Sequence, residues 1–224
     1  MNGTRKKLLL VAVAMVAVSA VVATQYARAT IGYEYGVDSV NGEGIRFIGR
    51  DNATDGVRLL RIDSGTLKLQ YNTDFLPGFN KTYTAAFGIV NEEQIPINIT
   101  DITVTPTTGN DYMQIWLHGD PDKPADQDTS SVFMWNKGSD VTPGDTTAWT
   151  LAAGNKDVTN MDGTNALTPV DATAQVRYND TYAGVASDGN SDFVWVQVSL
   201  DIPSGAGTQT CTGTITIEFE ATNS

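Results

Sequence analysis

Alternating apolar and polar residues are the dominant pattern of this chain, and they predict extended β-strands. Residues 30–37 read TIGYEYGV, with a large side chain at every second position. Four of these share one face of the strand: Ile31, Tyr33, Tyr35 and Val37. Such strict alternation is typical of a half-buried strand. Because a segment at a chain end frays unless it is paired, residues 30–38 either complete the sheet of their own domain or add to the sheet of a neighbouring subunit.

Similar alternation recurs along the rest of the chain and predicts which side chains face a core. The expected inward residues are Leu67, Leu69 and Tyr71; Tyr83, Ala85, Phe87 and Ile89; Met113, Ile115 and Leu117; Ile215, Ile217, Phe219 and Ala221. Further strands are predicted at residues 45–48, 57–62, 132–135, 149–151 and 172–178. Clusters of Gly, Asn, Asp and Pro separate these runs, as turns do between strands.

Two segments depart from simple alternation. In residues 95–104, isoleucines at every second position up to Ile99 share one face, and the pattern resumes at Ile102 in the opposite phase. An extra residue near Asp101, as in a β-bulge, would produce this slip. Residues 193–200 are apolar on both faces, which predicts a central strand that is buried on both sides.

The spacing of the predicted strands indicates the fold class. Strands at intervals of roughly 8–12 residues, with turn signals between them, are typical of β-sandwiches and barrels. No segment keeps a helical period for more than about two turns, and no internal repeat or linker divides the chain. We therefore expect an all-β protein with one β-sandwich domain over residues 39–224.

Residues 1–29 have the features of a secretory signal peptide. Arg5, Lys6 and Lys7 precede an apolar run at residues 8–23, and Ala27-Arg28-Ala29 matches a small-x-small cleavage site. The apolar run is also long enough to span a bilayer as a retained anchor, but the cleavage site favours removal before Thr30. We expect a secreted or cell-surface protein without further membrane contact once the leader is cleaved.

The charge of the chain limits its partners. Beyond the leader there are ten basic side chains, fourteen less the four in the leader, against 26 acidic ones, a formal net charge of −16. Nucleic acids and anionic lipids bind basic surfaces. The composition therefore argues against both, and it is compatible with an extracellular surface, with cation binding or with a salt-rich habitat.

Neither cysteine nor histidine chemistry is prominent. Cys211 is the only cysteine, so the chain cannot form an internal disulfide. We expect a buried small residue beside the last strand, the alternative being an intermolecular bridge. His118 is the only histidine and follows a predicted strand. It lies in no recognisable nucleophile context, so the expectation is an edge histidine and a protein that is not an enzyme.

Two acidic segments carry the oxygen ligands that calcium prefers. The candidate ligands are Asp120, Asp122, Asp126 and Asp128 in one segment, and Asp188, Asn190 and Asp192 in the other. Neither segment has the distal glutamate of an EF-hand loop. Acidic loops are more often only solvated, so calcium is a possible cofactor and no other is expected.

Two further features bear on a surface role. Asn-x-Ser/Thr sequons occur at Asn52, Asn80, Asn98 and Asn179, which makes these the candidate glycosylation sites. Four tryptophans could supply stacking platforms for sugar rings or could belong to the core: Trp116, Trp135, Trp149 and Trp195.

The overall plan of the chain resembles a known group of secreted proteins. A plain leader with a small-x-small site is followed at once by the alternating strand at residues 30–38. The domain then contains NEEQIPINIT at residues 91–100 and ends with GTITIEFEA at residues 213–221. This plan resembles the archaeal bundling pilins and the related bacterial TasA/camelysin fibre proteins.

The resemblance implies jelly-roll subunits that polymerise when the N-terminal strand of one subunit inserts into the next. Ile31, Tyr33, Tyr35 and Val37 would then be the anchors of the donated strand. The inward residues of 193–200 and 213–221 would line the groove that receives it. The leader lacks the processing motif of type IV pilins, which disfavours that class of pilus.

Together these observations predict the subunit of an extracellular filament, a head-to-tail homopolymer whose partner is a second copy of the same chain. The alternative is a monomeric cell-surface module that binds carbohydrate or calcium.

Overall fold

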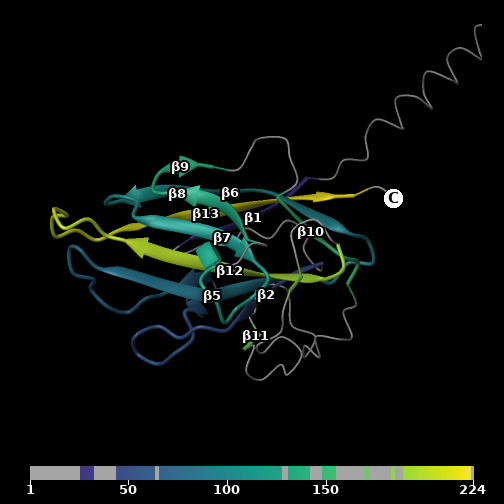
Figure 1. The fold of residues 1–224 in the computed structure, drawn as a ribbon, viewed down its shortest axis with the longest axis horizontal. Helices are drawn as coiled ribbons and strands as arrows, with labels where there is room; N and C mark the ends of the chain where they lie inside the picture. The colour runs from purple at the N-terminus through teal and green to yellow at the C-terminus, as the bar shows by residue number, and fades with distance from the viewer. Residues whose placement is uncertain are drawn as a thin grey trace, which may run out of the picture.

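The fold consists of two β-sheets packed face to face (Figure 1). The computed structural model describes residues 26–32, 44–63, 66–127, 131–141, 148–154, 170–171, 183–184 and 189–222. Within these ranges every regular element is a strand except one 3₁₀ turn, η1 (Ala125–Gln127), and no helix is long and apolar enough to cross a membrane. The predicted all-β class is confirmed.

The strands of each sheet come from distant parts of the chain. One sheet has the order β10 (Trp149–Leu151), β6 (Ile97–Thr108), β13 (Thr212–Ala221), β1 (Tyr26–Gly32), β4 (Thr66–Leu69) and β3 (Leu60–Asp63). We call it the β13 sheet. The other has the order β11 (Val170–Asp171), β2 (Ile45–Gly49), β5 (Asn80–Asn91), β12 (Phe193–Asp201), β7 (Met113–His118), β8 (Val132–Asn136) and β9 (Ser139–Asp140). We call it the β12 sheet. These orders establish a sandwich and do not by themselves identify a jelly roll.

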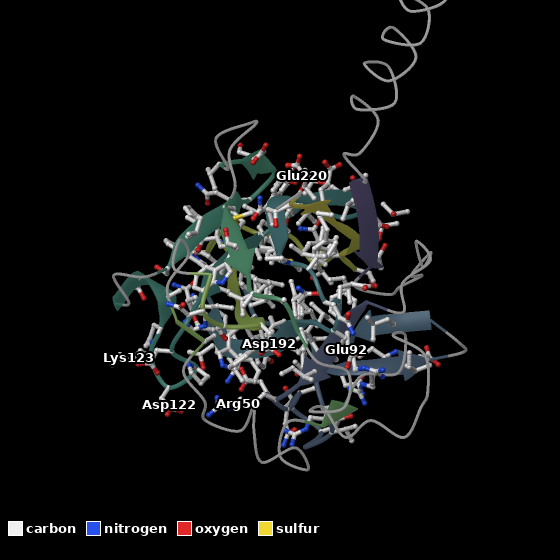
Figure 2. The ribbon with its side chains drawn as sticks, turned by 90° about the vertical axis from the view of Figure 1, so that its right-hand side faces the viewer. Arg50, Glu92, Asp122, Lys123, Asp192 and Glu220 are labelled. Atoms are coloured by element: carbon white, nitrogen blue, oxygen red, sulfur yellow. The ribbon has the colours of Figure 1, made fainter. Side chains whose placement is uncertain are left out.

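The strand directions define two ends of the sandwich. At one, the Asn91 end, β5 passes into β6 through residues 92–96. At the other, the Asp201 end, β12 passes into β13 through residues 202–211. In Figure 1 the Asn91 end, with the C-terminus, is on the right and the yellow β12–β13 turn is on the left. Figure 2 looks onto the Asn91 end, where Glu220 is labelled near the purple strand β1.

The core lies between the two sheets, where the predicted inward residues meet. The following are at most 4% exposed, as expected: Leu67, Leu69, Tyr83, Phe87, Ile89, Met113, Ile115, Leu117, Ile215, Ile217 and Phe219. A second apolar cluster covers the outer face of the β12 sheet and consists of Ile48, Ala85, Val90, Ala183, Phe193 and Trp195. Strand β12 contributes to both clusters, which confirms that it is buried on both sides.

The predicted bulge in β6 is confirmed. The register between β13 and β6 shifts between the pairs Glu218–Asp101 and Phe219–Ile99, so an extra residue of β6 lies at Thr100. The expectation that Ile95 shares one strand face with Ile97 and Ile99 is wrong. Ile95 lies in the turn before β6 with 44% of its surface exposed.

A second irregularity, in β5, was not predicted. Opposite β12 the register moves from Phe87–Val196 to Tyr83–Val198, so residues 84–86 of β5 face a single residue of β12. Because of this bulge Ala86 packs in the central core, and Ala85 packs in the outer cluster. The predicted inward orientation of Ala85 is therefore wrong, since the bulge reverses the alternation at that position.

Buried polar groups fix the Asn91 end. The Asn91 side-chain amide donates to the carbonyl oxygens of Ile95 and Ala152, both at 2.8 Å, and its oxygen accepts from the Glu93 backbone at 2.9 Å. Beside it, Arg46 Nε lies 2.8 Å from Glu92 Oε1, with both side chains at most 2% exposed. A buried amide with several partners and a buried ion pair together define a single turn conformation.

We predict that Glu92→Ala strongly destabilises the protein, because Arg46 then stays buried without this carboxylate. Loss of one partner from a buried ion pair costs about 3–5 kcal/mol, measurable as a lower free energy of unfolding in urea. Glu93→Ala, an exposed residue of the same turn, is the matched control and should change stability by less than about 0.5 kcal/mol. Equal unfolding midpoints for the two variants would contradict the prediction.

Candidate functional site

The most unusual feature of the fold is the interior position of the N-terminal strand. All seven residues of β1 pair antiparallel with β13, from Tyr26–Glu220 to Gly32–Thr214. On its other side β1 meets β4 in parallel register at a single pair, Gly32–Lys68. This one strand therefore joins the β3–β4 hairpin to the rest of its sheet.

The observed strand and the predicted one overlap only in part. Prediction placed a strand at residues 30–37, and β1 shares Thr30 to Gly32 with it. Ile31 lies opposite Ile215 in backbone register. The other three predicted anchors, Tyr33, Tyr35 and Val37, lie outside the described residues.

The predicted cleavage site lies inside β1. Removal of residues 1–29 would take away Tyr26 to Ala29, whose pairing partners are Glu220 to Ile217 of β13. Three residues of β1 would remain. The backbone N–H and C=O groups along the end of β13 would then need new partners, because buried main-chain groups are almost always hydrogen-bonded.

The strands beside β1, β13 and β4, present apolar side chains to the core, and β13 presents polar side chains to the outer face. On the core side Ile215, Ile217 and Phe219 of β13 are at most 2% exposed, and Leu67 and Leu69 of β4 at most 1%. Between them, the intervening residues of β13 are only partly buried: Thr214, Thr216, Glu218 and Glu220. A strand with apolar residues at every second position suits the place between β13 and β4, because its apolar face then lies on the core. We call the space between β13 and β4 the β1 slot.

The outer face of the β13 sheet is acidic. Burial raises the pKa of Asp101 in β6, and the carboxylates of Asp140 and Glu218 raise it further by repulsion. Its Oδ1 atom has no hydrogen-bond partner among the described residues. Negative charge on this face therefore costs free energy that the sheet contacts must offset.

Two residues of the first acidic segment form ion pairs with basic side chains. Asp120 Oδ2 lies 2.7 Å from Lys123 Nζ, and the bond from Lys123 lowers the pKa of Asp120. Asp122 Oδ1 lies 2.9 Å from Arg50 Nη2. Figure 2 shows Arg50, Asp122 and Lys123 on the same side of the molecule. Asp126 lies in η1, and Asp128 is outside the described residues.

The second acidic segment is described only in part. Asp188 lies outside the described residues, whereas Asn190 and Asp192 precede β12. Asp192 is buried, and its backbone carbonyl oxygen accepts from the backbone N–H of Asn91 at 2.7 Å. Across the described ranges no three His, Cys, Asp or Glu side chains come close enough to hold a metal ion. The predicted calcium ligands that lie within the described ranges are thus not brought together.

His118 is a buried residue of an interior strand rather than the expected edge histidine. Its strand β7 lies between β12 and β8, and its side chain is fully buried. Nε2 contacts the carbonyl oxygen of Thr84 in the β5 bulge. The bulge is bound from a second direction by Asp51, whose Oδ2 accepts from the Ala85 amide at 2.8 Å. Two side chains, one from β7 and one from the segment that follows β2, thus bind the main chain that the bulge leaves unpaired.

Arg50 connects the β5 bulge to the loop that follows β7. Its guanidinium lies 6.0 Å from the centre of the Trp195 ring and donates to the Pro121 carbonyl at 3.1 Å. The Thr84 hydroxyl donates to the same carbonyl at 2.7 Å. These contacts hold the loop after β7 over the outer apolar cluster. Alternation carries no signal for Arg50 or Asp51, so prediction missed both.

The tryptophans are mostly core residues. Trp135, Trp149 and Trp195 are at most 7% exposed, so they offer no face to a sugar ring. Trp116 is half-buried and stacks on Phe133 with ring centres 3.9 Å apart.

The sequons and the cysteine differ in accessibility. Asn52 and Asn80 are exposed, Asn98 is half-buried in β6 and bonded to Thr150 at 3.1 Å, and Asn179 lies outside the described residues. Cys211 directly precedes β13 and packs, half-buried, against the core. Burial raises the pKa of its thiol.

Comparisons with protein-family models, with curated proteins and with solved structures found no match.

We predict that Asp51 makes the stability pH-dependent. Burial raises the pKa of Asp51, and the Ala85 amide and Arg50 offset this only in part. An acid with a raised pKa in the folded state stabilises the fold when protonated, and this contribution is lost as the pH rises through the folded pKa.

Asp51→Asn should therefore stabilise the protein relative to the parent most at pH 7, and the difference in unfolding free energy should shrink towards pH 4. Asp74→Asn, at an exposed loop residue, is the matched control for the loss of one carboxylate. A difference for Asp51→Asn that grows as the pH falls would contradict the assignment.

Proposed function

We propose that this protein is the subunit of an extracellular filament, in which residues 30–38 of one chain occupy the β1 slot of the next. The observation that carries the proposal is the shared direction of β1 and β2. Strand β1 runs from the Asn91 end towards the Asp201 end, ending at the Gly32–Thr214 pair. Strand β2 starts again at the Asn91 end, where Ile45 pairs with Asn91.

A closed single chain therefore has to turn back along the whole sandwich between β1 and β2. The return path runs along β13 from the level of Thr214 to the level of Ala221. These residues are seven positions apart in the strand, which is about 24 Å at roughly 3.4 Å per residue. The twelve residues from 33 to 44 span at most about 40 Å when extended. Closure is feasible, but only if most of residues 33–44 serve as the return connection.

The predicted long strand and closure exclude each other. With Gly32 opposite Thr214, a strand that continued to Asp38 would end about 20 Å further on, at roughly 3.4 Å per residue. The six steps from Asp38 to Gly44 reach only about 22 Å, half of the return distance of about 44 Å. In this register a strand at residues 30–38 cannot lie in the slot of its own chain and still reach β2, whereas the slot of a second chain sets no such limit.

The slot supplies both contributions that strand addition needs. The edge of β13 offers main-chain hydrogen bonds, which give affinity, and its alternate buried side chains set the register. The cleaved chain would keep three residues of its own β1, whereas a donated strand supplies the four alternating anchors Ile31, Tyr33, Tyr35 and Val37. A head-to-tail contact of this kind does not close on itself, so it propagates as a filament.

The alternative, a monomeric module for carbohydrate, has less support. Three of the four tryptophans are in the core. Only Trp116 therefore stays accessible enough to stack on a sugar ring. Calcium binding by the acidic segments would be compatible with either function.

We predict that Tyr33→Lys/Tyr35→Lys abolishes filaments seen by electron microscopy of the exported chain. Both substitutions place a charge on the anchor face of the donated strand. The matched control is Glu34→Lys, which adds positive charge to the opposite face of the same strand and should leave filaments intact. Deletion of residues 30–38 should give monomers that do not polymerise and have a lower free energy of unfolding, because the β1 slot then stays empty.

Two results would count against the proposal. If the parent chain stays monomeric and folded at all concentrations, filament assembly is wrong and the monomeric module becomes the better account. If the Tyr33→Lys/Tyr35→Lys chain forms filaments as readily as the parent, polymerisation does not use the N-terminal strand.

A further inference from the structure

The two ends of the sandwich each present an exposed aliphatic side chain on a rigid turn. At the Asp201 end, Leu76 is 73% exposed and Phe79 is 42% exposed. Their turn is bonded to the end of β12 through Gly78 N to Ile202 O at 3.0 Å and Ile202 N to Phe79 O at 3.1 Å. Phe79 stacks on Phe75 with ring centres 5.8 Å apart. The exposed surface therefore belongs to a fixed conformation.

The Asn91 end carries a smaller counterpart. Ile95 is 44% exposed in the turn between β5 and β6. The Asn91 amide holds the Ile95 carbonyl at 2.8 Å, and Thr222 bonds to the Pro96 carbonyl at 2.9 Å. This turn, too, has a defined conformation that directs an aliphatic side chain outward. Surfaces that are already ordered lose little entropy when they bind.

The length of the chain limits how far apart these two ends can lie in a filament. This step rests on the proposed function. A donated strand that runs like β1 leaves the slot at the Asp201 end of the receiving subunit. Five residues, 39–43, then lead to Gly44 at the Asn91 end of the donor. Five residues and their flanking bonds span at most about 22 Å, so the donor's Asn91 end must lie next to the acceptor's Asp201 end.

We propose that the turn with Leu76 and Phe79 docks against the turn with Ile95 of a second copy of this chain, as a contact separate from strand donation. The partner is a second copy because residues 39–43 are short and bring the Asn91 end of the donor to the turn with Leu76 and Phe79 of the acceptor. Burial of exposed aliphatic and aromatic side chains stabilises such a contact. The contact is heterologous, since it joins two different surfaces of identical subunits, and it therefore propagates along the filament.

Charge substitutions on the two turns test this contact. Leu76→Asp and Ile95→Asp should each raise the concentration needed for polymerisation by about tenfold or more, because each removes an apolar contact and buries a carboxylate. The matched control is Ile62→Asp on the edge strand β3, where the isoleucine is 39% exposed. That variant should polymerise like the parent. Urea unfolding of the monomers checks that all three variants remain folded.

Cross-linking identifies the partner surface. In a Cys211→Ser background, which leaves no other thiol, Leu76→Cys/Ile95→Cys filaments treated with a short bis-maleimide should give a covalent ladder on denaturing gels. Each single substitution alone, and Leu76→Cys/Ile62→Cys, should give no ladder. A ladder requires each subunit to be joined through both turns, as a heterologous contact demands.

The outcomes separate this inference from the proposed function. If the parent forms filaments while both Asp variants polymerise normally and the ladder is missing, the docking contact is wrong and strand donation stands. If the parent forms no filaments, both proposals fail. If the ladder forms and the Asp variants are impaired while Ile62→Asp is not, the docking contact is supported.

Discussion

The structure depends on the need to satisfy the main-chain hydrogen-bonding groups of β13 on both sides. On one side β6 pairs along the strand, and on the other the partner within the described part of the chain is β1. An interior strand with one face on the core leaves such groups unpaired only at a cost of about 1–3 kcal/mol for each buried group. Whatever strand fills the β1 slot therefore decides whether the β3–β4 hairpin belongs to the sandwich. That requirement makes a strand close to the predicted cleavage site important for the stability of a domain without internal disulfides.

The same requirement recurs at smaller scale in the interior of the domain. The β5 bulge leaves the main chain of Thr84 and Ala85 without partners in the sheet, and His118 and Asp51 bind it. At the Asn91 end, one buried amide and one buried ion pair set the turn between the two sheets. These polar groups contribute little net stability, but each restricts the chain to one register. A defined register is important for a strand in the β1 slot, because its residues must match those of β13 and β4 one by one.

Local alternation was sufficient to predict much of this fold, and its failures have physical causes. Alternation identified the inward faces of β4, β7 and β13, the burial of β12 on both sides and the bulge in β6, because each depends on neighbouring residues along one strand. It failed at Ala85, where Asp51 and His118, each 34 residues away from its bonding partner in the sequence, stabilise a bulge. It also failed at Ile95, because the turn geometry is set by the buried Asn91 side chain. For the candidate site, alternation marked a strand near the N-terminus but carried no information on its neighbours, which come from residues 66–69 and 212–221.

Electrostatics adds a constraint on any assembly of this chain. Beyond the predicted leader the formal net charge is −16, with fourteen basic residues in the whole chain and four of them in the leader. Copies of such a chain repel one another over a Debye length of about 8–10 Å at moderate salt, and the acidic outer face of the β13 sheet adds to this repulsion. Attraction between subunits must therefore come from contacts that do not depend on charge, namely main-chain hydrogen bonds and buried apolar side chains. The β1 slot offers the main-chain hydrogen bonds, and the two ends of the sandwich carry the apolar side chains. Because salt screens the repulsion and leaves these contacts largely intact, high ionic strength should favour the polymer over the free subunit.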